Sequence, residues 1–89
     1  MSIKIIDRIT PAQCRAARAL LEITQTELAD TAKLGLSTVV DFEKKRREVS
    51  LLSIKAIRDA LTNAGVEFMD ENGGGPGVRL RKRTIKRSK

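Results

Sequence analysis

Cationic side chains gather in two short segments of this 89-residue sequence. One is the run Lys44 to Arg47, and the other is the segment 79–89, which holds seven of the 18 Lys and Arg residues and no acid. The remaining residues carry 11 cations and 11 acids, so the formal net charge of +7 comes from segment 79–89. Such a charge can neutralise nucleic-acid phosphates, or it can form a solvated, solubilising tail.

Side chains that commonly carry catalysis or hold metals are scarce. The sequence has no His, and its single cysteine, Cys14, can form neither an internal disulfide nor a zinc site. No nucleophile with a partner base and no cluster of carboxylates stands out. We therefore expect no enzyme, no metal and no cofactor, and we interpret Cys14 as a small buried apolar side chain.

Capping signals predict two helices in the first part of the chain. Thr10 is a good N-cap and proline is tolerated at the first helical position, which predicts a helix from Pro11 to about Glu22. Thr24 followed by Glu27 has the spacing of a capping box and predicts a short second helix over residues 25–33. Cys14 is expected on the inner face of the first helix.

Two further helices and a hairpin are predicted downstream. Gly35 opens a third helix, about residues 36–45, and Ser50 caps a fourth whose apolar residues repeat at helical spacing up to Gly65. Beyond Gly65 the pattern alternates around a glycine-rich turn, which predicts a β-hairpin over 66–82. The expected fold class is all-α, with four helices and this hairpin, and the expected helical domain is residues 10–65. Residues 1–9 are expected to form a short strand or arm, and residues 83–89 are expected to form a flexible basic tail.

The second and third predicted helices are short and separated by a tight turn, the arrangement of a helix-turn-helix. The segments Gln25-Thr26-Glu27-Leu28-Ala29 and Ser37-Thr38-Val39-Val40-Asp41-Phe42-Glu43 resemble the Cro and phage-repressor family, also called the XRE family. The resemblance covers about Pro11 to Leu61. It implies a four-helix, lambda-repressor-like domain that binds an operator in double-stranded DNA as a transcriptional regulator or repressor, with its third helix in the major groove.

The resemblance also implies roles for individual residues. Gln25, assisted by Thr24, matches a phosphate-binding position at the start of the second helix, and Arg18 with Glu43 matches a structural salt bridge. Positions that reach base edges are occupied by Leu36, Ser37, Val40 and Asp41. Leu36 could pack on a thymine methyl, Ser37 could donate or accept a hydrogen bond, and Asp41 could accept one from a cytosine amino group. Asp41 could equally be a solvated helix position.

Further cations are candidates for phosphate contacts. They comprise Lys33, Lys44, Lys45, Arg46 and Arg47 in the domain, and Arg79, Arg81, Lys82 and Arg83 towards the tail. The run Lys44 to Arg47 also complements the dipole of the third helix, which needs no ligand. Lys33 and Lys45 stand where the family usually has glycine. Either the turns are remodelled, with Gly35 absorbing the strain, or both lysines adopt left-handed conformations and add cations facing phosphate.

A homodimer would let two recognition helices reach two half-sites. Its interface could be the hairpin edge, Val78 to Lys82, or the isoleucine-rich start, Ile3 to Ile6. The alternative function is a protein-binding module that caps or inhibits another regulator, with Leu36 and Val40 as interface anchors. No transmembrane segment or signal peptide is evident, which leads us to expect a cytoplasmic protein.

Overall fold

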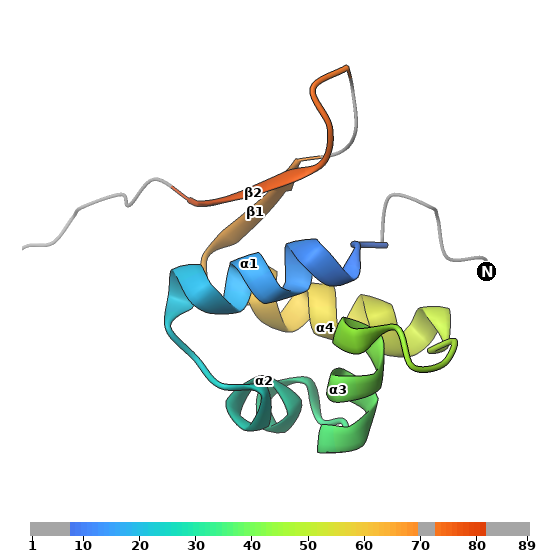
Figure 1. Cartoon of the computed structure of the whole chain (residues 1–89). Helices are drawn as coiled ribbons and strands as arrows, with labels where there is room; N and C mark the ends of the chain where they lie inside the picture. The colour runs from blue at the N-terminus through green and yellow to red at the C-terminus, as the bar shows by residue number, and fades with distance from the viewer. Residues whose placement is uncertain (1–7, 70–72, 82–89) are drawn as a thin grey trace, which may run out of the picture.

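A computed structural model describes residues 8–69 and 73–81. Its elements are α1 (Pro11–Leu21), α2 (Gln25–Ala32), α3 (Leu36–Lys44), α4 (Leu51–Asn63), β1 (Val66–Met69) and β2 (Gly77–Leu80). This arrangement confirms the predicted helical fold with a C-terminal hairpin (Figure 1). The strand predicted within residues 1–9 and the tail 83–89 lie largely outside the described residues.

Three of the four helices begin at a side chain that caps them. Thr24 accepts a hydrogen bond from the Glu27 amide at 3.0 Å, and Glu27 accepts one from the Thr24 amide at 2.9 Å. This confirms the predicted capping box, which satisfies two helix-end donors reciprocally. Thr10 forms the same box with Gln13 at the start of α1, and Ser50 caps α4 by accepting from Ser53.

The core is built almost entirely from aliphatic side chains, with one phenylalanine, Phe42, among the buried residues. Each helix contributes at least one buried residue, and the segments before α1 and before α4 add Ile9 and Val49. Ala29, on α2, is buried. Val66 is also buried, so the first hairpin strand completes the core that the helices begin.

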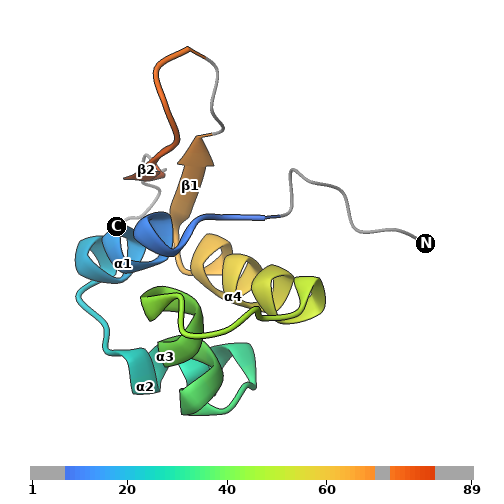
Figure 2. The same ribbon diagram turned by 45° about the vertical axis from the view of Figure 1, so that its right-hand side comes forward.

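The hairpin is antiparallel, with Val66 opposite Leu80 and Met69 opposite Gly77. It packs against α1 and α4. Gln13 on α1 fastens it there, because the side-chain amide donates to the carbonyls of Met69 at 3.2 Å and Gly77 at 3.0 Å. Figures 1 and 2 show that α1 lies between the hairpin and the α2–α3 pair, so the hairpin and α3 are on opposite sides of the domain.

Both lysines that replace the usual glycines adopt left-handed backbone conformations. Lys33 ends α2 with φ 60° and Lys45 ends α3 with φ 57°, while Gly35 has an ordinary φ of −68°. Of the two alternatives, the one in which Gly35 absorbs the strain is therefore wrong. The helix ends keep the geometry that glycine would favour, because the amides of Lys33 and Lys45 still bond to carbonyls of the preceding turn.

Candidate nucleic-acid interface

Glu43 on α3 holds the three helices of the candidate interface together. Its carboxylate accepts two hydrogen bonds from Arg18 on α1, from Nε at 2.7 Å and from Nη2 at 2.8 Å. Cys14 Sγ and Gln25 Nε2 each donate another at 3.0 Å. Because α1 and α2 both bond to one buried carboxylate of α3, the orientation of α3 is fixed from its inner side.

The ionisation of Glu43 follows from these contacts. Burial alone would raise the pKa of its carboxyl, but the hydrogen bonds from Arg18, Cys14 and Gln25 outweigh it and hold the pKa below its ordinary value. The pKa of the Cys14 thiol is raised by burial and by its hydrogen bond to Glu43. Cys14 is thus a buried thiol, as the sequence suggested, that also donates a hydrogen bond to Glu43.

The phosphate-binding position expected at the start of α2 lies in the same network. Thr24 and Gln25 are the N-cap and first residue of α2. The side-chain nitrogen of Gln25, Nε2, donates a hydrogen bond to the Glu43 carboxylate. The Thr24 hydroxyl accepts one from the backbone amide of Glu27. Any phosphate contact by Gln25 would therefore use the second hydrogen of that nitrogen or the backbone amide at the helix start.

The opposite side of α3 faces solvent. Leu36 is 45% exposed, Ser37 is exposed and Val40 is partly exposed. Val39, Phe42 and Glu43 on the other side of the helix are buried. The structure therefore brings three of the four expected base-contacting positions onto one accessible face of α3.

Asp41, the fourth position, is paired with arginines of its own chain. Its Oδ2 accepts a hydrogen bond from Arg47 Nε at 2.8 Å, and Arg46 Nη1 lies 3.8 Å from Oδ1. The sequence left two interpretations of Asp41 open, a contact to cytosine and a solvated helix position, and it did not predict this ion pair. It follows that Asp41 offsets part of the positive charge that Arg46 and Arg47 would otherwise present.

The other candidate phosphate-contacting cations of the domain lie at the ends of α2 and α3. Lys33, Lys44 and Lys45 are all exposed. A polar hollow of about 540 Å³ continues this surface towards the start of α4. It is lined by Arg8, Arg47, Glu48, Val49, Ser50 and Leu51. Arg8 was not among the cations predicted from the sequence. Its place close before the start of α1 was the one signal that could have indicated it.

The hairpin cations are separate from this surface. Arg79 bonds to Glu67 across the hairpin at 2.7 Å, and Arg81 donates to the Thr62 carbonyl at 3.2 Å. Arg79 is on β2, and the hairpin lies on the side of α1 away from α3 (Figure 2). Lys82 and Arg83 lie outside the described residues. The structure thus separates Arg79 and Arg81 from the cations near α3.

Comparison with known proteins agrees with this geometry. A family model described as helix-turn-helix matches residues 15–62, which include all of α2 and α3. No curated protein gives a match. Among the described residues, no helix combines the length and apolar character needed to cross a membrane. The matched segment spans more than half of the chain, and we conclude that the chain belongs to the XRE/Cro-like helix-turn-helix family of DNA-binding regulators.

Proposed function

We propose that this protein regulates transcription by binding a specific operator with α3 in the major groove. The observation that carries the proposal is the two-sided character of α3. Glu43 fixes its inner side to α1 and α2, and the opposite side leaves Leu36 and Ser37 accessible. A rigid helix with accessible small and apolar side chains suits contact with base edges and thymine methyls.

Phosphate contacts would orient α3 in the groove. The candidates are Thr24 and Gln25 at the start of α2, Lys33, Lys44 and Lys45 at the helix ends, and Arg46 and Arg47 after α3. Three lysines in this set are exposed. Contacts of this kind set affinity and register without reading sequence. Specificity then rests on Leu36, Ser37 and Val40, while Asp41 acts chiefly through its arginine partners.

A homodimer would make this small reading surface sufficient. Two recognition helices about 34 Å apart would reach successive major grooves on one side of the duplex. The hairpin is a candidate dimer element, because its two strands pair only with one another among the described residues. Arg79, Arg81, Lys82 and Arg83 would then add charge near the dimer contact or attract DNA from a distance.

The deciding experiment is binding to DNA from the promoter region of the protein's own gene, against random DNA, over a salt series. We expect selective binding that persists at physiological salt. Equal binding to both DNAs that disappears with salt would contradict a specific regulator, because charge alone produces that behaviour. Footprint symmetry reports whether a dimer binds.

The second candidate function is a protein-binding module that inhibits another regulator. It is favoured by the exposure of Leu36 and by the pairing of Asp41 with Arg46 and Arg47, which lowers the positive charge beside α3. Ser37→Glu separates the two functions, since a new acid on α3 should abolish operator binding. Asn63→Glu, at the exposed end of α4, is the control. Loss of a protein complex but not of DNA binding in Ser37→Glu would favour the module.

A further inference from the structure

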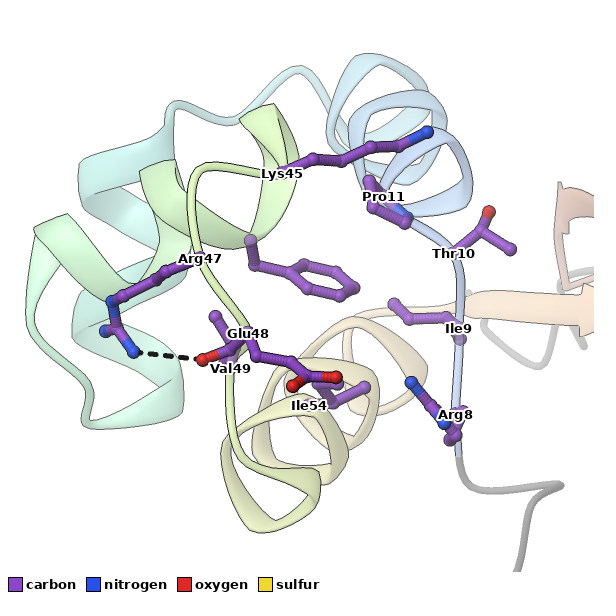
Figure 3. A pocket seen from close by; sticks show the side chains of 10 residues that line it. Arg8, Ile9, Thr10, Pro11, Lys45, Arg47, Glu48, Val49 and Ile54 are labelled. Carbon is purple, nitrogen blue, oxygen red and sulfur yellow. Dashed lines mark hydrogen bonds between the residues drawn. The ribbon is translucent and has the colours of Figure 1, made fainter.

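A hollow of about 490 Å³ opens between the segment that precedes α1 and the loop that joins α3 to α4 (Figure 3). Its apolar lining comes from Ile9, Phe42, Val49 and Ile54. These side chains belong to the hydrophobic core, so the hollow is a place where the core reaches the surface. Its volume falls within the range of pockets that hold small organic molecules.

The rim of this hollow carries more positive than negative charge. Arg8, Lys45 and Arg47 line it together with one acid, Glu48. Arg47 is already engaged, because it bonds to Asp41 at 2.8 Å and to the Glu48 carbonyl at 3.3 Å, and Figure 3 shows the latter bond. Neither Arg8 nor Lys45 has a side-chain hydrogen bond or ion pair to any described residue. Among the residues that the structure describes, one positive charge of this rim is therefore left without an acid to balance it.

We propose that this hollow binds a small organic monocarboxylate, with its apolar body against Phe42, Val49 and Ile54. The carboxylate would lie at the rim, between Arg8 and Lys45. A single negative charge on the ligand balances the uncompensated cation. A neutral ligand would leave this cation unpaired, and the second charge of a dianion would be repelled by the Glu48 carboxylate. Because the apolar lining is small and the rim is exposed to solvent, binding is weak. The proposal does not rest on the proposed function, although Lys45 and Arg47 line the hollow and are also candidate phosphate contacts.

The backbone at Lys45 provides an informative variant. Lys45 has φ 57°, a conformation that glycine adopts without strain, so Lys45→Gly removes the ammonium and keeps the helix end. Lys33 has φ 60° at the end of α2 and does not line the hollow. Lys33→Gly is therefore a matched control with the same charge change and the same backbone relief. Both variants should fold.

The test is a titration of the full chain with benzoate and, separately, with its neutral analogue benzamide, followed by amide NMR shifts. We expect benzoate to shift the amides of Phe42, Val49 and Ile54, and benzamide to bind several-fold more weakly. Lys45→Gly should weaken benzoate binding about three- to fivefold, the worth of one exposed ion pair. Lys33→Gly should leave it unchanged.

Three results would overturn the proposal. One is equal binding of benzoate and benzamide, which would mean that the rim charges select nothing. Another is equal loss in Lys45→Gly and Lys33→Gly, because benzoate would then be attracted by overall charge. The third is a set of shifts spread over surface lysines away from the hollow. Conversely, Glu48→Gln removes the rim acid, and we expect it to tighten benzoate binding.

Discussion

The Arg18 guanidinium on α1 and the Glu43 carboxylate on α3 meet with two parallel hydrogen bonds, Nε to Oε2 at 2.7 Å and Nη2 to Oε1 at 2.8 Å. The Glu43 side chain is 1% exposed and the Arg18 side chain 20%. A carboxylate in this position depends on its partners, because an unpaired buried charge is costly. The pair therefore determines whether α3 keeps its place.

Arg18→Met should destabilise the protein by about 3 kcal/mol, since it removes the charge partner of a buried carboxylate. Urea unfolding measures this loss. The control is Lys55→Met, which breaks the exposed Lys55–Asp59 pair on α4 and should cost less than about 1 kcal/mol. Similar losses in the two variants would show that burial of Glu43 adds nothing to the pair.

The lowered pKa of Glu43 predicts how stability depends on pH. Folding favours the ionised carboxyl, so this contribution is complete above the ordinary pKa of 4.5 and is lost as the pH falls through the lower folded pKa. The difference in unfolding free energy between the wild type and Glu43→Gln should be largest near about pH 6 and shrink towards about pH 3. A constant difference would contradict the shift, and Glu67→Gln serves as an exposed control.

Lys33→Gly should raise the free energy of unfolding by about 1 kcal/mol, because glycine adopts the left-handed conformation of this position more easily. Thermal or urea unfolding reports the gain. Lys44→Gly makes the same change at the last residue of α3, which is still helical, and should lower stability by up to about 1 kcal/mol. If both variants are destabilised, the side chain of Lys33 contributes more than its backbone strain costs.

Asp41→Asn should make non-specific DNA binding tighter and more sensitive to salt, since it releases Arg46 and Arg47 from their acid. The slope of log K against log salt should steepen by about one to two if both arginines then contact phosphate. Asp59→Asn, with the same charge change on α4, should leave the slope nearly unaltered. Weaker and less selective binding by Asp41→Asn would instead indicate that Asp41 reads a base.

Gln13→Glu should loosen the hairpin while keeping the first helix cap. The new carboxylate still accepts from the Thr10 amide, but it cannot donate to the carbonyls of Met69 and Gly77. Hydrogen exchange at the hairpin amides should accelerate roughly tenfold, the effect of losing about one buried hydrogen bond. Glu27→Gln exchanges the same atoms in the α2 capping box and should leave hairpin exchange unchanged.

Local signals in the sequence were sufficient to predict the helices. Thr24 and Glu27 lie three residues apart, and each satisfies a backbone donor of the other, so their spacing alone indicates where α2 begins. Ser50 caps α4 in a similarly local way, and the alternation after Gly65 predicted the hairpin. Such interactions need no knowledge of the tertiary structure.

Contacts between distant or competing groups could not be predicted in this way. Gln13 bonds to carbonyls 56 and 64 residues away, and no local pattern specifies such partners. Asp41 had several possible partners, and only the path of the chain after α3 brings Arg47 to it. The backbone of Lys33 was ambiguous, because sequence shows a mismatch with the usual glycine but not which residue adopts the left-handed conformation.

The position of the hairpin across α1 from α3 has a practical consequence for engineering. Sites that share no contacts contribute additively to free energy. Substitutions at residues 36, 37 and 40 and substitutions at Arg79 or Leu80 should therefore add in their effects on folding stability, so any effect of a hairpin change on DNA affinity reports on the dimer contact. The exposed face of α3 and the hairpin are thus two separate surfaces that can be altered on one small core.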